Sequence, residues 1–265
     1  MKSTVSYRSE IRGVIEIALA YQMSYLGKVA KKARASVRFG LLALLMVLPS
    51  SLKVPLYRSL FGYSIGRGVK IGFSWIDVGE LEIGDGVSIG HLNRFKRVPH
   101  VSIGAHTIIA NANTFTSAPE FTSKQSLRTR KNLPRLVIGE QCGISLGHYF
   151  DVQDEIVVGR FTTIAGVGSA FWTHYLDLSS ATQATKAIRI GEYCMVGAGA
   201  KFVPGSAVGD RCVVALGSVI TRQYSESLWM FAGNPAKPIK PLPPNAKYFH
   251  RVAGWIGTPE LDQTQ

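Results

Sequence analysis

Apolar residues recur at every sixth position in the second half of the chain. The run consists of Ile190, Val196, Phe202, Val208, Val214 and Ile220. A small residue stands four positions after each of the first five: Cys194, Ala200, Ser206, Cys212 and Ser218. An α-helix repeats every 3.6 residues and a strand every two, so neither produces this spacing. A six-residue period is typical of a parallel β-helix, in which each hexapeptide forms one short face of a coil.

The same spacing continues upstream with interruptions. Pairs of aliphatic residues six apart begin at Ile65, Ile83, Ile103, Ile138 and Val158, and Phe150 and Ala170 complete two of the later coils. The pattern predicts an all-β solenoid with aliphatic layers from about residue 65 to 224. A β-sandwich rich in Val, Ile and Gly is the alternative, but its strands would need two-residue alternation and turns of varied length.

Two interruptions of the repeat predict inserted loops at residues 116–135 and 171–188, where a solenoid commonly places its functional groups. The first contains five Lys or Arg and one acid, Glu120. It is either a solvated basic loop or a contact with an anionic substrate, ligand or subunit.

The second interruption contains the sequence FWTHYLDL, with His174 close to Trp172 and Asp177. A neutral imidazole accepts a proton near pH 7, which suits a general base. Asp177 is the candidate to fix the tautomer by accepting the other ring N–H. From composition alone, an ordinary loop histidine is the simpler interpretation.

The charge of the chain is uneven. The net charge is +13, and residues 1–60 contain ten Lys or Arg against Glu10 and Glu16. We therefore predict a basic, helical extension at 1–60, a β-helix domain at 61–240 and a tail at 241–265. Such asymmetry indicates an anionic surface or ligand. Nucleic acid is not expected, because no helix-turn-helix, zinc or RNA-binding signature is present.

The extension also has an apolar side. The apolar run at 39–48 is too short to span a bilayer as a helix. It either lies on an anionic membrane surface or packs on the coil or a neighbouring subunit. Three cysteines give no disulfide framework, which favours a reduced, intracellular protein. The tail after Pro241 could cover the end of the coil or extend over a partner.

Three segments resemble the hexapeptide-repeat acyltransferases: IGEYCMVGAGAKFVPGSAVGDRCVVALGSVITR, FWTHYLDL and the closing FAGNPAKPIK. The resemblance covers about residues 65–241. It implies a left-handed parallel β-helix, a homotrimer and acetyl-CoA as co-substrate. The LPSSLKVPLYRSLFGYSIGRGVKIG segment, with GHYFD and THYLD, is similar to sugar O-acetyltransferases of exopolysaccharide, lipopolysaccharide or capsule biosynthesis. That similarity implies a saccharide acceptor and a cytoplasmic protein, placed at the inner membrane face if the extension binds lipid.

The resemblance also implies roles for individual residues. His174 matches the catalytic base. The positions that match acetyl-CoA contacts, in a groove between subunits, are Gly197, Ala198, Leu216, Gly217, Thr221, Arg222, Lys237 and Lys240. The chain has Ala-Leu-Gly-Ser and Thr-Arg where the family commonly has Gly-Ala-Gly-Ser and Thr-Lys. His148 and Asp151 are expected beside the acceptor together with Trp172, although His148 could instead be a corner residue of the coil.

Other functions remain open at the level of sequence. His91, His100 and His106 could be compared with the zinc ligands of γ-type carbonic anhydrases, which share this coil. Their spacing does not match that family, so no metal is expected. An N-acetyltransferase acting on an amino sugar would keep the fold and cofactor. A catalytically silent β-helix that serves as a scaffold is a third possibility.

Overall fold

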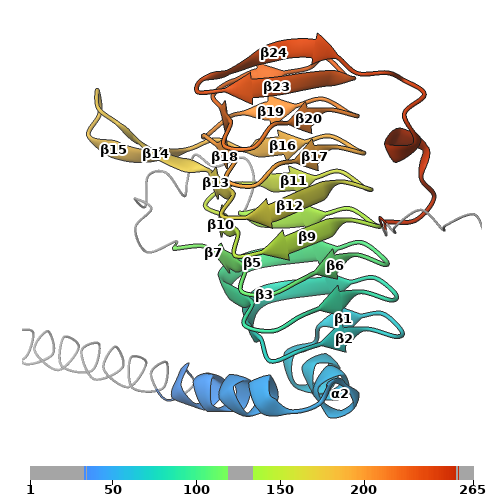
Figure 1. Cartoon of the computed structure of the whole chain (residues 1–265). Coiled ribbons are helices and arrows are strands. Elements are labelled where there is room, and N and C mark those ends of the chain that lie inside the picture. The colour runs from blue at the N-terminus through green and yellow to red at the C-terminus, as the bar shows by residue number, and fades with distance from the viewer. Residues whose placement is uncertain (1–32, 34, 119–133, 255, 257–265) are drawn as a thin grey trace, which may run out of the picture. The chain divides into compact units, whose positions relative to one another are not determined.

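The computed structural model describes residues 33, 35–118, 134–254 and 256. The chain divides into two compact units, residues 1–45 and 46–265. In the first unit, residues 35–45 are helical. The second unit contains a short helix, α2, and a stack of short strands (Figure 1). Within the described part of the chain, no helix combines the length and apolar character needed to cross a bilayer.

The stack of strands is a parallel β-helix, which confirms the solenoid predicted from the six-residue period. Successive turns of the chain pair in parallel and in register, for example Ile65 with Ile83 and Ile71 with Ile89. The aliphatic residues of the repeat point inward and are buried. Layers run from Ile65 in the first coil to Tyr224 near the last.

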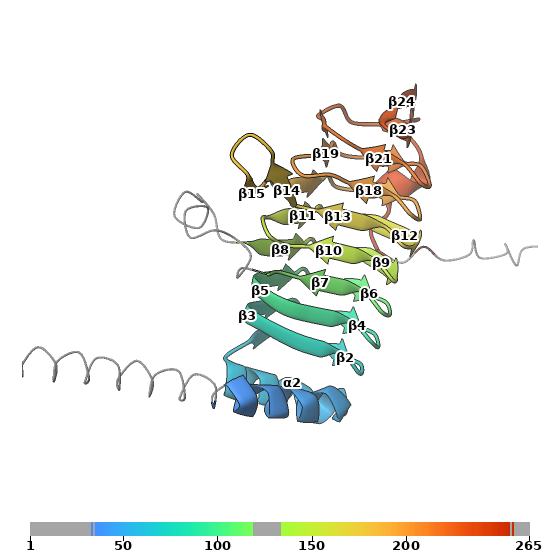
Figure 2. The same cartoon turned by 90° about the vertical axis from the view of Figure 1, so that its left-hand side faces the viewer.

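Each coil has three faces, numbered here in chain order. Face 1 contains β1 (Ser64–Ile65), β8 (Arg135–Ile138), β11 (Ile156–Val158), β16 (Ile188–Ile190), β19 (Ala207–Val208) and β22 (Gln223–Tyr224). Face 2 contains β2 (Lys70–Ile71), β4 (Ser88–Ile89), β6 (Ile108–Ile109), β9 (Gly143–Leu146), β12 (Thr163–Val167), β17 (Met195–Val196), β20 (Val213–Val214) and β23 (Trp229–Gly233). Face 3 contains β7 (Thr114–Thr116), β10 (Tyr149–Asp151), β13 (Ala170–Trp172), β18 (Lys201–Phe202) and β21 (Val219–Ile220), stacked one above another in Figure 2. The longer strands β3 (Trp75–Ile83) and β5 (Arg94–Ile103) continue from face 3 into face 1.

Face 3 contributes a column of stacked phenylalanine rings to the core. Neighbouring ring centroids lie 4.4, 4.7, 4.4 and 5.0 Å apart along Phe95, Phe115, Phe150, Phe171 and Phe202. The inward residue of β13 is Phe171, not Ala170 as the six-residue count predicts. The reason is a register irregularity between Ile164 and Val167, which adds a residue before β13.

Helix α2 (Ser50–Phe61) packs on the first coil. The Lys53 ammonium donates to the carbonyls of Ile71 and Gly72, and the Arg58 guanidinium donates to that of Ile65. These bonds occupy carbonyls at the end of the stack, where unpaired strand edges would otherwise be exposed. Helix α2 therefore belongs to the second unit, although all of it except Phe61 falls within the predicted extension 1–60. At the other end, β23 pairs antiparallel with β24 (Ala236–Pro241).

The tail segment lies along the side of its own coil. Within the 3₁₀ helix η2 (Lys247–His250), the Tyr248 hydroxyl donates to the Cys194 carbonyl at 2.9 Å. The Tyr193 hydroxyl donates to the Arg251 carbonyl at 3.4 Å, and Gly254 N–H donates to Gln141 Oε1 at 2.7 Å. The described part of the tail therefore covers the corner between faces 1 and 2.

The three corners of the coil differ in character. The hairpin corner lies between faces 3 and 1, where both insertions leave the repeat. The leucine corner lies between faces 2 and 3 and carries exposed apolar side chains: Phe73, Leu92, Leu146, Val167 and Leu216. The cysteine corner lies between faces 1 and 2 and contains Cys142, Cys194 and Cys212.

The structure describes the second predicted insertion but only the ends of the first. Much of the first, with the predicted basic residues Lys124, Arg128, Arg130 and Lys131, lies outside the described residues. The second forms an antiparallel hairpin of β14 (His174–Asp177) and β15 (Thr182–Thr185). This hairpin places His174 directly beside the coil.

Candidate active site

His174 is the first residue of the hairpin and lies next to the end of β10. Its Nδ1 is 2.7 Å from Oδ2 of Asp151, and its side chain is about one-third exposed. The carboxylate is almost fully buried, at 3% exposure. A buried carboxylate acts as an acceptor, so Nδ1–H donates to it and Nε2 keeps the basic lone pair. This arrangement suits an imidazole that accepts a proton from a bound substrate.

Asp151 is held by the backbone that follows β13. Its Oδ2 accepts from the N–H groups of Thr173 at 3.1 Å and His174 at 3.2 Å. The Thr173 hydroxyl donates to the Asp151 carbonyl at 2.6 Å. These bonds offset the cost of burying a carboxylate. Asp151 therefore fixes the orientation of the His174 ring, and its burial leaves little of it exposed to a ligand.

Asp177 does not orient His174, so that prediction is corrected. Alternate residues of a strand face opposite sides, and Asp177 is three positions along β14 from His174. Its Oδ1 instead accepts from Ser179 N–H at 2.9 Å. Hydrogen bonds from Ser179 and Ser180 lower the pKa of this exposed carboxylate.

Sequence reasoning expected Asp151 beside the acceptor and missed its role toward His174. The signal that could have found it was the register. With Phe150 inward, Asp151 pairs with Trp172, two residues before His174. That placement brings the side chains of Asp151 and His174 to the same corner of adjacent coils.

Aromatic side chains border His174 on face 3. Trp172 is 40% exposed, and its ring lies edge-on to the imidazole with centroids 6.0 Å apart. The Tyr149 ring packs against Trp172 at 4.8 Å. Exposed aromatic faces next to a polar group suit the apolar side of a ligand ring. Trp172 therefore lies beside His174, and its role as a substrate contact stays a prediction.

His148 is a rung of a polar ladder inside the leucine corner. Successive coils place Asn93, Asn113, His148 and Ser169 one above another, and the acceptor of each bonds the backbone N–H of the next. Asn113 Oδ1 accepts from His148 N–H at 2.9 Å, and His148 Nδ1 accepts from Ser169 N–H at 3.1 Å. His148 is 1% exposed, so the structure supports the corner interpretation and not acceptor contact.

Burial keeps His148 neutral. Desolvation lowers the pKa of its imidazole to about 4, although the nearby Ile164 carbonyl acts in the opposite direction. A protonated ring would also lose the acceptor that Ser169 N–H requires. The charge state of His148 is therefore linked to the stability of the coil.

Four of the predicted cofactor residues lie at the leucine corner. Gly197 and Ala198 follow β17, and Leu216 and Gly217 follow β20 on the next coil. Gly217 N–H donates to the Ala198 carbonyl at 2.9 Å. The Leu216 side chain is 77% exposed. This group is therefore compact, with Leu216 and Gly217 exposed and Gly197 buried.

The remaining predicted cofactor residues lie elsewhere on the coil. Thr221 and Arg222 follow β21 at the hairpin corner, and the Arg222 guanidinium lies 4.9 Å from the Tyr224 ring centroid. Lys237 and Lys240 are exposed on β24. One chain thus does not gather all eight residues into a single groove, because faces separate the corners.

The cysteines and the other histidines form no cluster suited to a metal ion within the described residues. No group of three or more His, Cys, Asp or Glu side chains in the described part of the chain could hold a metal ion. The three cysteines are buried, form no disulfide and are hydrogen-bonded to backbone carbonyls. Burial raises the pKa of Cys142 to about 12, so this thiol is not a nucleophile at neutral pH.

Comparisons with known proteins support the fold. No family model matches the chain, and no curated protein matches it in sequence. A variant of the N-acyltransferase AntD from Bacillus cereus, in complex with dTDP and coenzyme A, is 14% identical with a TM-score of 0.50; the match covers 72% of this chain and 89% of that one. The polySia-specific acetyltransferase NeuO is 20% identical over 76% and 86% of the two chains (TM-score 0.47). The hexapeptide-repeat acetyltransferase VCA0836 from Vibrio cholerae, complexed with acetyl-CoA, is 18% identical over 77% and 85% (TM-score 0.42). At these identities the likeness to AntD shows a shared fold.

We predict that His148 makes the coil sensitive to acid. An unfolded histidine binds a proton near pH 6.5, whereas the folded imidazole does so only near pH 4. The contribution of neutral His148 to the free energy of unfolding is thus fully present above pH 6.5. It is lost as the pH falls toward 4, by up to roughly 3 kcal/mol. His148→Asn, which copies the Asn93 and Asn113 rungs, should lack this loss. Urea unfolding at pH 7 and at intervals down to pH 4 measures the free energy of unfolding of both proteins. If this free energy falls equally with pH in the wild type and in His148→Asn, the prediction is contradicted.

Proposed function

We propose that this protein is an acetyl-CoA-dependent O-acetyltransferase that acts on a sugar hydroxyl of a polysaccharide precursor. The observation that carries the proposal is the His174–Asp151 pair, because it presents an oriented, partly exposed imidazole at the corner of a hexapeptide-repeat coil. The Trp172 ring beside it suits the apolar face of a sugar. A nucleotide-linked or lipid-linked saccharide would be the acceptor.

The transfer needs only one proton-accepting group. Nε2 of His174 removes the proton from the acceptor hydroxyl as its oxygen attacks the thioester carbonyl. The resulting imidazolium is stabilised by Asp151, as in other oriented histidine–carboxylate pairs. The C–S bond then breaks, and the coenzyme A thiolate takes the proton from the imidazolium. The acetyl group ends on the sugar oxygen and the imidazole is neutral again.

Coenzyme A is the proposed acyl carrier. The support is the resemblance of the repeat run and the closing FAGNPAKPIK segment, together with the coenzyme A that AntD binds in the same fold. Gly197 and Ala198 would lie near the thioester, and the backbone of Leu216 and Gly217, which bonds to Ala198, would contact the pantetheine arm. Lys237 and Lys240 are exposed cations suited to phosphates.

We further propose a homotrimer in which each active site is shared. His174 lies at the hairpin corner, whereas Leu216 and Gly217 lie at the leucine corner across face 3. A rotationally symmetric ring brings one corner of a chain against a different corner of its neighbour. The exposed apolar column at the leucine corner, including Leu92, Leu146 and Leu216, is suited to such an interface.

Two rival functions are distinguished by assay. AntD is an N-acyltransferase, so transfer to an amino sugar is the closest rival. Thiol release with matched hydroxyl and amino acceptors would separate the two. A silent scaffold would neither bind acetyl-CoA in a calorimetric titration nor release thiol.

The catalytic pair is tested by three substitutions. His174→Ala should lower kcat by about 10²- to 10⁴-fold, the usual contribution of a general base. Asp151→Asn should cost a comparable factor, because an amide can donate to Nδ1 and hold the wrong tautomer. Asp177→Asn is the matched control and should leave kcat within about twofold, since exposed polar substitutions have small effects. Steady-state thiol release measures kcat, and calorimetry should show unchanged acetyl-CoA affinity. Wild-type turnover in His174→Ala would refute the general-base role.

The shared site is tested by complementation. His174→Ala damages the hairpin corner and Leu216→Arg damages the leucine corner, so each homotrimer should be inactive. In trimers mixed at random by co-expression, about one interface in four joins two intact corners. Activity should therefore return to about a quarter of wild type in the unselected mixture. It should return to about a third in trimers purified through two different tags, because each of these contains both variants and one intact interface. If mixing restores nothing, each site lies within one chain.

We also propose a peripheral contact with the cytoplasmic face of an anionic membrane. Leu52 and Leu60 on α2 are each more than half exposed, and residues 17–76 contain nine Lys or Arg and no Asp or Glu. Apolar side chains among cations suit an anionic lipid surface. Cosedimentation with phosphatidylglycerol vesicles, but not phosphatidylcholine vesicles, is expected. Leu52→Glu should weaken it, whereas Leu178→Glu, at an exposed leucine of the hairpin, should not. Equal binding by both variants would argue against the contact.

A further inference from the structure

The turn that holds His174 also organises a second group of side chains. Residues 151–155 connect face 3 to face 1 at the hairpin corner and include three acids. Asp151 contacts His174, as described above. Asp154 Oδ2 accepts from the Thr185 hydroxyl at 2.8 Å, and its Oδ1 accepts from Glu155 N–H at 2.7 Å. Glu155 binds two arginines, which belong to neighbouring strands of face 1.

Glu155 lies between the guanidinium groups of Arg135 and Arg189. One carboxylate oxygen contacts Arg135 Nε, and the other contacts Arg189 Nη2. The Glu155 side chain is 2% exposed, whereas those of Arg135 and Arg189 are 51% and 58% exposed. Two cations share one anion, so the group keeps a net charge of +1. A guanidinium has five N–H donors, and each of these still has donors available to solvent.

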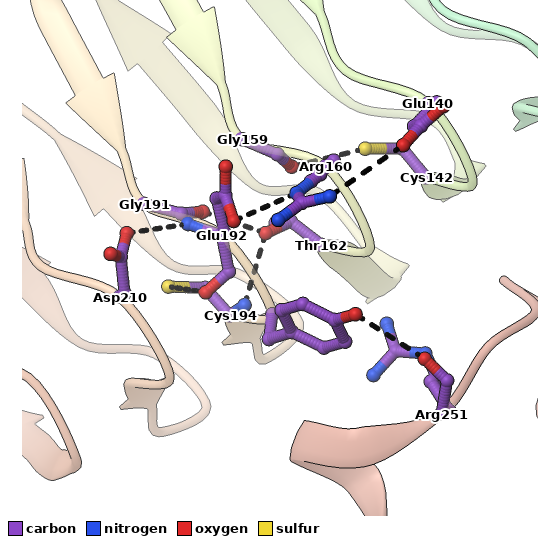
Figure 3. A network of polar contacts seen from close by, with 11 residues as sticks. Glu140, Cys142, Gly159, Arg160, Thr162, Gly191, Glu192, Cys194, Asp210 and Arg251 are labelled. Carbon is purple, nitrogen blue, oxygen red and sulfur yellow. Dashed lines mark hydrogen bonds and ion pairs between the residues drawn. The ribbon is translucent and has the colours of Figure 1, made fainter.

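The cysteine corner has the opposite arrangement. There Arg160 lies between two acids, 3.9 Å from Glu140 and 2.9 Å from Glu192 (Figure 3). That group carries a net charge of −1. Of these two arginine clusters, only the one around Glu155 has more cations than anions, and its turn also carries the carboxylates of Asp151 and Asp154.

The arginine pair and His174 are both held by side chains of the turn 151–155. Asp151 and Glu155 are four residues apart, so their Cα atoms are separated by at most about 14 Å. The hairpin strengthens this link, since His174 pairs with Thr185 and Thr185 bonds Asp154. The imidazole and the two guanidiniums are thus fixed to one short turn.

We propose that Arg135 and Arg189, held in place by Glu155, bind a negatively charged group on the saccharide acceptor. The group is a carboxylate or a phosphate, both of which match the donor geometry of guanidinium. This inference rests on the proposed acetyl transfer and narrows its acceptor to an acidic sugar or sugar phosphate. Arginines with one exposed side and one fixed side bind without losing much side-chain freedom, which favours affinity.

A purely structural role for Arg135 and Arg189 would lead to a different result. A buried carboxylate needs a partner, and removing one cation would then destabilise the fold without changing the choice of acceptor. Acceptor kinetics therefore distinguish the two roles, provided that stability is measured alongside.

The experiment uses two matched pairs of acceptors with acetyl-CoA. Glucuronic acid against glucose tests a carboxylate, and N-acetylglucosamine 1-phosphate against N-acetylglucosamine tests a phosphate. The wild-type protein should prefer the charged member of at least one pair by about tenfold or more in kcat/KM. Arg135→Gln and Arg189→Gln should each raise KM for that charged member by about 10- to 150-fold, the range for a hydrogen bond to a charged group. The KM for acetyl-CoA and for the neutral member should stay unchanged.

Two controls accompany these variants. Arg160→Gln removes an ion-paired, half-exposed arginine from the cysteine corner and should leave every kinetic constant unchanged. Arg189→Lys keeps the charge without the planar fork, and should lose less than Arg189→Gln. Thermal melting of each variant reports stability. A fall in melting temperature with unchanged acceptor KM would assign the pair a structural role and overturn the inference.

The outcomes also separate this inference from the proposed function. Acetylation of neutral sugars with no preference for charge would overturn the acidic acceptor and leave acetyl transfer standing. Calorimetric binding of a charged probe that depends on Arg135 and Arg189, without any acetyl transfer, would support the anion site and refute the enzyme. Absence of binding or transfer for both charged probes would overturn the inference.

Discussion

Parallel, in-register stacking of coils is the constraint on which the rest of this structure depends. Because each coil pairs with the next residue by residue, every position of the repeat becomes a column along the stack. Inward columns must be filled by side chains that tolerate their own kind as neighbours, as the rings from Phe95 to Phe202 do. A substitution at one position therefore alters side-chain packing against the coils on either side. The same constraint aligns the corners, so that chemical groups placed at a corner collect into a continuous edge.

Function in this architecture comes from departures from the repeat. The coil continues unbroken through the face strands, while the hairpin β14–β15 leaves at one corner and brings His174 back to the coil. A buried carboxylate at that corner is tolerated because backbone N–H groups of Thr173 and His174 bond it. The turn from Asp151 to Glu155 thus links a rigid scaffold to an imidazole on one side and to two guanidiniums on the other. Rigid support of this kind is what a transfer reaction requires of its positioning groups.

Burial decides which of the candidate histidine and aspartate side chains a ligand could contact. His148 and His174 have the same side chain and similar sequence surroundings, yet one is a neutral rung inside the leucine corner and the other is partly exposed. Ser169 N–H takes the Nδ1 lone pair of the first, and Asp151 takes the Nδ1 proton of the second. The two rings therefore have opposite tautomers for reasons that lie in their neighbours. Asp151 and Asp177 show the same division, since only the buried one meets the imidazole.

The amino-acid sequence by itself determined the coil, the three inward columns and the places where insertions leave it, because a six-residue period allows one regular packing of aliphatic side chains. It also indicated His174 as a base, partly through family resemblance. Tertiary structure decided the partner of that base, the buried role of His148, the inward turn of Phe171 and the pairing of Arg135 and Arg189 through Glu155. These depend on which residues of different coils share a corner. A single shift of register between Ile164 and Val167 changes that outcome, and local spacing does not report it.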